Sequence, residues 1–146
     1  MSDKSFLERA SDYAFSELKR VGGDPANLPV PLQTVVVIYS AQGIIDNGGF
    51  GYFFGQDFDF SPPYSVFSES YRRIGAVEAA NCIDKAAALF PFEDPHLFKE
   101  KRMQFMDALD ESSEFVELGD RVCGDETVWA ALEEYARRHS ELLLLT

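Results

Sequence analysis

The sequence predicts one all-α domain of about six to seven helices, and three observations support this fold class. Apolar residues recur every three or four positions along most of the chain, as on one face of a helix. Capping residues and Gly or Pro breaks divide this pattern into segments of helical length. The 146 residues, of which 46% are hydrophobic and 14% aromatic, suffice for a single domain, residues 1–146, with its own core.

The first predicted helix covers residues 3–21. Its apolar side chains, from Phe6 to Val21, follow helical spacing, and either Ser2 or Asp3 can cap its N-terminus. The Gly-Gly-Asp-Pro sequence that follows is typical of the end of a helix, because Gly accepts the left-handed conformation found there.

The second predicted helix, residues 31–46, competes with a strand. Residues 35–39 are β-branched and aromatic, so their propensity alone would allow a strand. The apolar stretch is longer than an average strand, however, and Pro31 suits the first turn of a helix. We therefore predict a helix that the Asp-Asn-Gly-Gly sequence terminates, with Asn47 or Gly48 able to take the left-handed conformation.

Shorter helices are predicted in the rest of the chain. An aromatic run at 50–54 and a loop at 55–64 come first. Two of the later helices have candidate caps, either Ser112 or Ser113 for one and Asp125 for the other. The leucines at 142–145 are too few for a membrane span, and we expect them to pack or fray. The predicted helices cover residues 65–74, 76–90, 95–109, 115–122 and 126–142.

The net charge of the chain limits the kinds of partner that it can bind. Asp and Glu number 25 against 13 Lys and Arg, for a net charge of −12. Such a field repels nucleic acid and anionic membranes, so we expect no direct binding to either and a basic protein as the natural partner. A homodimer is a further option. The chain shows neither a signal peptide nor an apolar run of membrane-spanning length, which predicts a cytoplasmic location.

No catalytic or metal-binding pattern is recognisable in the sequence. Cys82 and Cys123 lie in apolar helical patterns and are interpreted as buried free thiols. His96 and His139 have no other ligand at a recognised metal spacing, so we assign them structural roles. The Gly-rich stretch 48–55 lacks the Lys-Ser/Thr pair of a phosphate-binding loop. We therefore expect no enzymatic activity, no cofactor and no bound metal.

The acidic residues are concentrated in one part of the chain. Residues 107–134 hold ten acids and a single base, Arg121, whereas the remainder holds fifteen acids and twelve bases. Such a segment is either a set of solvated helix faces, which charge alone favours, or a surface that imitates the phosphate backbone of DNA. The candidate partner-binding residues are Asp107, Asp110, Glu111, Glu114, Glu117, Asp120, Asp125 and Glu126.

Several short motifs resemble a known family. The sequence Asn-Gly-Gly-Phe at 47–50 is followed by paired aromatics, an Ile-Gly-Ala helix start at 74–76, a Leu-Asp pair at 109–110 and a Phe-x-x-Leu segment at 115–118. Over about residues 28–140, this arrangement resembles a family of small acidic bacterial proteins named for a DNA-mimic member. The hallmark residues, to which we assign structural roles, are Asn47, Gly48, Gly49, Phe50, Phe53, Phe54 and Gly75.

The resemblance implies an all-helical, non-enzymatic protein. In the namesake an acidic surface occupies the DNA-binding face of a helix-turn-helix transcription factor, so a DNA mimic acting in transcription regulation is the leading hypothesis. The chain departs from the family at Tyr52, where Gln is common, and in a longer loop at Pro62 and Pro63. One alternative is an immunity or antitoxin-type inhibitor of a basic toxin or nuclease. Another is a small-ligand-binding or enzymatic domain that uses the aromatic region 50–64.

Overall fold

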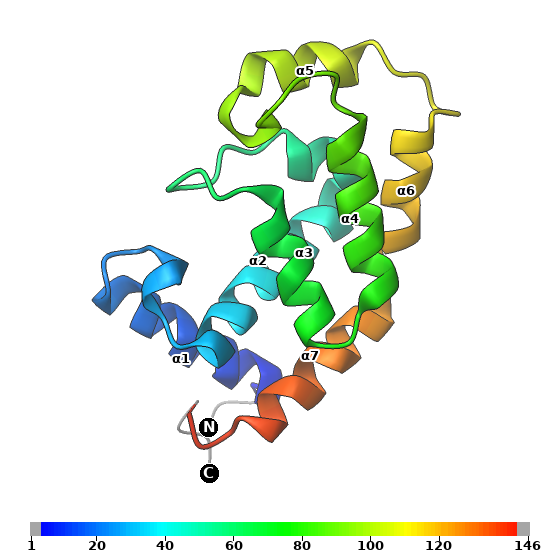
Figure 1. Cartoon of the computed structure of the whole chain (residues 1–146). Helices are drawn as coiled ribbons and strands as arrows, with labels where there is room; N and C mark the ends of the chain where they lie inside the picture. The colour runs from blue at the N-terminus through cyan, green and yellow to red at the C-terminus, as the bar shows by residue number, and fades with distance from the viewer. Residues whose placement is uncertain (1–3, 143–146) are drawn as a thin grey trace.

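The computed structural model describes residues 4–142, and within them the secondary structure is helical with no strands (Figure 1). The all-α prediction is confirmed. In this described part of the chain, seven α-helices are joined by short loops, two of which contain a 3-10 turn. In chain order the elements are α1 (Phe6–Arg20), η1 (Pro25–Asn27), α2 (Val30–Phe54), α3 (Tyr64–Arg73), α4 (Val77–Leu89), η2 (Pro95–Leu97), α5 (Lys99–Asp107), α6 (Glu114–Val122) and α7 (Glu126–Arg138).

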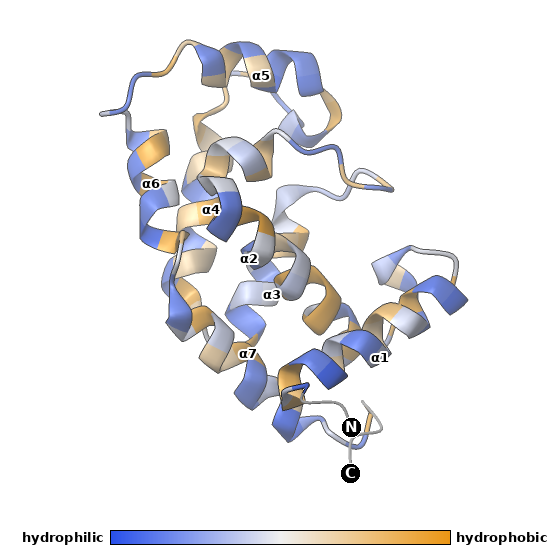
Figure 2. Cartoon of the chain, turned by 180° about the vertical axis from the view of Figure 1, so that it is seen from behind, coloured by the Kyte–Doolittle hydropathy of each residue, from blue (hydrophilic) through white to orange (hydrophobic). Residues whose placement is uncertain are grey.

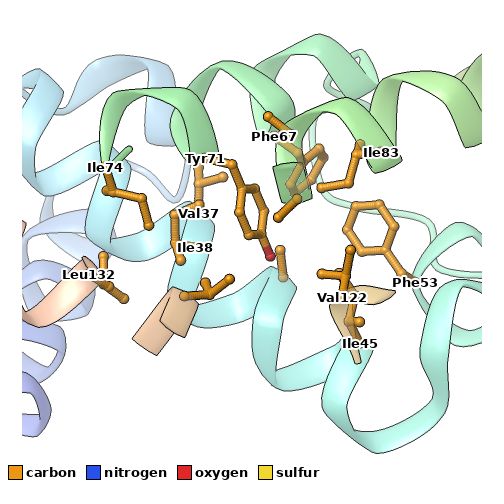
Figure 3. Close-up of a cluster of buried hydrophobic side chains, with 14 of the residues drawn as sticks. Val37, Ile38, Ile45, Phe53, Phe67, Tyr71, Ile74, Ile83, Val122 and Leu132 are labelled. Atoms are coloured by element: carbon orange, nitrogen blue, oxygen red, sulfur yellow. The ribbon is translucent and has the colours of Figure 1, made fainter. Parts of the chain in front are cut away.

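Helix α2 is the centre of the fold, and it is helical where a strand was the alternative. α1, α3, α6 and α7 all pack against it, while α4 packs against α3 and α6. Figure 3 shows the resulting core, in which Ile38 and Ile45 of α2 meet Tyr71 of α3, Ile83 of α4 and Leu132 of α7. Each large apolar side chain buried there stabilises the fold by about 1.5–3 kcal/mol.

The hallmark glycines divide α2 into two helical parts at a sharp bend. The backbone leaves helical geometry at Gly48 and Gly49, so the regular helix that begins at Val30 ends where the sequence predicts, and a second short helical part continues through Phe54. The left-handed residue is Gly49, with φ +67° and ψ −163°, and not Asn47 or Gly48 as predicted. That combination is open essentially to Gly alone. Gly48 is needed for space, because a Cβ there would lie 2.6 Å from Cβ of Tyr52.

The bend directs three phenylalanines into the core. Phe50, Phe53 and Phe54 are at most 2% exposed. They form a cluster of mostly edge-on contacts, for example 5.3 Å between the ring centres of Phe50 and Phe54. α6 approaches this cluster closely at Gly119, where a Cβ would lie 2.9 Å from Cβ of Phe50. Phe115 of α6 completes the cluster, with its ring centre 5.4 Å from that of Phe54.

The helix caps agree with the sequence in two of three cases. Ser113 accepts a hydrogen bond from the Val116 amide at the start of α6, and Asp125 accepts one from the Thr127 amide at the start of α7. The cap of α1 is Ser5, whose hydroxyl oxygen accepts a hydrogen bond from the Glu8 amide. The predicted caps Ser2 and Asp3 lie outside the described residues.

Two predicted helix boundaries are wrong. α7 ends at Arg138 instead of 142, and Leu142 is 50% exposed, while the other three leucines of the tail lie outside the described residues. The predicted helix 95–109 divides into η2 and α5, because Phe98 has extended geometry with φ −128° and ψ 79°. Leu97 and Phe98, which lie at this break, are exposed.

The two cysteines differ in their surroundings. Cys82 of α4 is buried, as predicted, and burial raises the pKa of its thiol. Cys123 is exposed, so the prediction of a second buried thiol is wrong. It follows the last residue of α6 with extended backbone, and therefore leaves the buried face of that helix. Of the helices described, none has both the length and the hydropathy to cross a membrane.

Candidate partner-binding surface

The acidic segment forms one edge of the molecule. It begins at the end of α5, crosses the loop 108–113, and descends along α6 to the start of α7 (Figure 1). α6 buries Phe115, Leu118 and Val122 on one side, which turns its carboxylates to the other. Figure 2, from behind, shows hydrophilic and hydrophobic residues mixed along α6 and α7, as expected for helices with one buried face.

Seven of the eight candidate residues in this edge are exposed. The exception is Asp125, which is half-buried and caps α7. Three of the exposed residues, Glu114, Glu117 and Asp120, recur at intervals of three along α6 and so share a face. We call the group the acidic edge; its exposed members are Asp107, Asp110, Glu111, Glu114, Glu117, Asp120 and Glu126.

Few of these carboxylates are neutralised within the chain. Glu117 pairs with Arg121 at 2.8 Å, and further along Glu133 pairs with Arg137 at 3.7 Å. The other eight acids between 107 and 134 form no ion pair with the residues described. The edge therefore presents its negative charge to solvent.

Asp110 is held in place at the turn before α6. One of its carboxylate oxygens accepts hydrogen bonds from the Ser112 hydroxyl at 2.7 Å and from the Ser112 amide at 2.9 Å. These bonds stabilise the charged form and lower the pKa of Asp110. The carboxylate thus stays ionised to a lower pH than a free aspartate and keeps a fixed direction.

A hollow connects the acidic edge with the bend in α2. It has a volume of about 310 Å³, and its floor includes Phe50, Phe115 and the backbone of the hallmark glycines. Asp110, Glu111 and Asp120 also line it. The Asn-Gly-Gly-Phe motif and the acidic residues, which are separate in the sequence, therefore meet at one place.

Two other hallmark residues, Asn47 and Gly75, do not line this hollow. Asn47 is exposed beside the bend. Gly75 has φ +89° between α3 and α4, and there the amide of Ala76 donates to the carbonyl of Tyr71 at 2.9 Å, which closes the end of α3.

His96 and His139 each lie against a tyrosine ring. Within residues 4–142 no cluster of His, Cys, Asp and Glu could hold a metal ion.

A polar network behind the acidic edge was not predicted. The Gln42 side chain is fully buried; its amide accepts from the Tyr71 hydroxyl at 2.8 Å and donates to the carbonyl of Val122 and to Asp46. Asp46 also accepts from the Trp129 indole at 2.9 Å. The network ties α2, α3, α6 and α7 together. The only cue in the sequence is an amide inside an otherwise apolar stretch.

A buried arginine was also not predicted. Arg102 of α5 is 0% exposed and donates to the carbonyls of Phe54, Pro95 and Gln56 at 2.7–3.1 Å. Its fourth partner is the carboxylate of Asp57, at 2.9 Å. A cue was present, because position 102 falls on the apolar stripe formed by residues 98, 105 and 109.

Fold and surface define an all-helical acidic protein with an exposed acidic edge. Within that class, the chain belongs to the DMP19-like protein family, a family of DNA mimics, whose model matches residues 26–139. The predicted resemblance over about residues 28–140 is thereby confirmed. No curated protein and no solved structure matches the chain. DNA mimics as a family bind DNA-binding proteins in place of DNA, and the matched region includes the whole acidic edge.

Proposed function

We propose that the acidic edge binds the nucleic-acid-binding face of a DNA-binding protein, such as a transcription factor, and thereby excludes DNA. The observation that carries the proposal is the row of exposed carboxylates that runs from Asp107 to Glu126 in a chain of this family. The proposed role is inhibition by occupancy, which needs no catalytic group.

Three features of the edge support this role. Glu114, Glu117 and Asp120 repeat three residues apart along α6, with ~5–6 Å between neighbouring Cβ atoms. Glu117 pairs with Arg121, whereas the outer two carboxylates have no ion pair among the residues described. Such a regular row of negative charges is the feature that a phosphate backbone also offers. The helix that carries these three carboxylates packs tightly against Phe50, so its backbone needs little ordering when a partner binds. The remaining acids extend the row at both ends.

The proposed partner face is rich in Lys and Arg. Attraction between it and the edge accelerates association and weakens with salt, because exposed charges are screened over a Debye length of about 8 Å at physiological ionic strength. Selectivity comes from the hollow beside the bend. An Arg or Lys side chain can lay its apolar stem on Phe50 and Phe115 and direct its charge to Asp110 or Asp120.

The test is capture of proteins from the source cell at low salt, followed by affinity measurements with the captured protein. A triple variant, Glu111→Gln, Glu114→Gln and Asp120→Asn, neutralises acids without ion pairs. A matched control, Glu69→Gln, Glu93→Gln and Asp94→Asn, removes the same charge from exposed positions elsewhere. We expect the first triple to weaken binding about tenfold or more and the control to change it little.

Some results would contradict the proposal. Failure to retain any DNA-binding protein would do so, as would equal weakening by both triples, since the effect would then be one of net charge. Binding that a DNA duplex does not compete away would also count against it. Capture of a nuclease or toxin whose activity is blocked would instead favour the immunity-type inhibitor.

A further inference from the structure

A second cavity lies on the opposite side of the molecule from the acidic edge. It has a volume of about 430 Å³, within the range of small-molecule sites. Its walls come from α1, the turn with η1, the middle of α2, the loop 55–63 and the start of α3. Figures 1 and 2 both show this loop projecting on the side of α1, away from α6.

The walls of this cavity are preformed. Val36 and Val37 of α2 and Phe67 of α3 are at most 5% exposed and form a floor fixed by the core. Phe58 anchors the loop, because its ring centre lies 4.8 Å from that of Phe67. Pro25 and the pair at 62–63 stiffen the rims, since each proline has a fixed φ. Such walls do not collapse readily into the cavity.

The mouth of the cavity is crossed by an exposed aromatic ring. Phe60, at the tip of the loop, is 61% exposed, and its ring reaches Gly23, where a Cβ would lie 3.9 Å from Cε2 of Phe60. Phe60 and Ser61 have φ of +68° and +42°, which L-residues rarely adopt. Strained residues of this kind are concentrated at ligand clamps, where the surrounding structure holds them.

The residues that line the cavity favour a positively charged ligand. Four phenylalanines line the cavity, namely those at 15, 58, 60 and 67, and two carboxylates, Asp24 and Asp59, lie among them. Asp24 uses one oxygen to accept from the Ala26 amide, which leaves its second oxygen for a ligand. Among the described lining residues there is no Lys or Arg. Aromatic faces and carboxylates both attract organic cations.

We propose that this cavity binds a small organic cation with an apolar body, an aryl- or alkylammonium compound. The apolar part lies on Val36, Val37 and Phe67, the charged end faces Asp59 and Asp24, and Phe60 covers the bound molecule. The site is separate from the acidic edge. It uses only the second half of the aromatic region 50–64, which the sequence suggests as an alternative ligand-binding region. Phe50, Phe53 and Phe54 belong to the core instead.

The test uses three soluble probes that share one body: phenethylamine, phenethyl alcohol and phenylacetate. Each is titrated into the full chain, and NMR chemical-shift changes locate the site and give the Kd. We expect the amine to shift resonances of Val36, Val37 and Phe67 and to bind about fivefold more tightly than the alcohol, as one partly screened ion pair allows. The acetate should bind most weakly.

Two variants and one control complete the experiment. Asp59→Asn should remove most of the preference for the amine, whereas Asp120→Asn, an equal change on the acidic edge, should leave it intact. Phe60→Ala should weaken all three probes. These three positions are exposed, so the variants are expected to fold.

Other outcomes overturn the proposal. No binding of any probe would do so, as would equal binding of amine and alcohol. Amine-induced shifts confined to α5 and α6 would show attraction to the acidic edge instead of a site. Equal losses in Asp59→Asn and Asp120→Asn would show a general field effect.

Discussion

Gln42 and Arg102 are both completely buried polar side chains, and both join helices that are distant in sequence. They differ in what they bind. Gln42 is neutral and binds two side chains, Tyr71 and Asp46, as well as one carbonyl. Arg102 is charged and donates to three carbonyls and a single carboxylate. When Gln42 is substituted, a second substitution can also remove its side-chain partner Tyr71. When Arg102 is substituted, no second substitution can remove the backbone carbonyls that it leaves unpaired.

Each centre has a buried tyrosine beside it. Tyr71 donates to Gln42, and Tyr64 lies close enough to Arg102 and Asp57 for both charges to act on it. Burial raises the pKa of both phenols, that of Tyr64 to about 12. The difference between the two centres can therefore be examined both by substitution and by pH.

The largest effect is expected for Arg102→Ala. The substitution leaves the carbonyls of Phe54, Pro95 and Gln56 without this donor and opens a cavity beneath α5, so we expect a loss of about 3–5 kcal/mol in the free energy of unfolding. Chemical denaturation followed by circular dichroism measures it. Lys101→Ala, at the exposed neighbour, is the control; a loss below about 1 kcal/mol for Arg102→Ala would refute the structural role.

A smaller effect is expected for Gln42→Leu. Loss of the amide leaves the buried Tyr71 hydroxyl without its acceptor, at a cost of about 2 kcal/mol. The double variant Gln42→Leu, Tyr71→Phe removes both partners and should recover part of that loss in the same denaturation experiment. A double variant as unstable as the sum of its two single variants would show that the comparison between the centres is wrong.

Alkaline pH gives the third prediction. In the unfolded chain Tyr64 ionises at its ordinary pKa of 10.0, and in the folded chain at about 12, so its contribution is complete below pH 10 and is lost as the pH rises toward 12. At about pH 11 Tyr64 accounts for a loss of about 1.4 kcal/mol; Tyr64→Phe should remove this share and leave the share of the buried Tyr71. Denaturation at pH 8 and 11 measures the difference. Tyr52→Phe, at an exposed tyrosine, should retain the wild-type pH dependence.

The smallest effect is expected for Asp57→Asn. Asp57 is 61% exposed, so water screens its attraction for Arg102, and an amide oxygen can still accept the hydrogen bond. We expect a loss of less than about 1 kcal/mol in the free energy of unfolding. A loss as large as that of Arg102→Ala would mean that the buried cation requires a full counter-charge and that the carbonyls alone do not stabilise it.

The sequence was sufficient for the helices because their apolar periodicity is a local property. Within residues 4–142 it placed every α-helix and two of the three caps. It failed where the outcome depends on contacts between elements. Gly49 bends α2 because Phe50 and Phe53 must enter the core, and Arg102 occupies an apolar stripe because carbonyls from η2 and the end of α2 converge on it. Neither arrangement is encoded in local propensity.

The candidate surface was predictable in composition but not in shape. Acidic residues at helical spacing are expected to be exposed, and Asp107, Asp110 and Glu114 are. The hollow that joins Asp110, Glu111 and Asp120 to the hallmark bend depends on how α6 packs on α2 at Gly119. Similarly, the aromatic loop is visible in the sequence, but the cavity that it forms with α1 is a property of the tertiary fold.

The unequal exposure of the two cysteines makes the molecule suited to site-selective labelling. A maleimide dye or nitroxide would attach to Cys123, whereas Cys82 is shielded by the core and its raised pKa leaves less reactive thiolate. Cys123 follows α6 directly, between Asp120 and Asp125. The natural sequence thus carries a spectroscopic reporter position within the acidic segment, where fluorescence or paramagnetic relaxation would register a partner as it arrives.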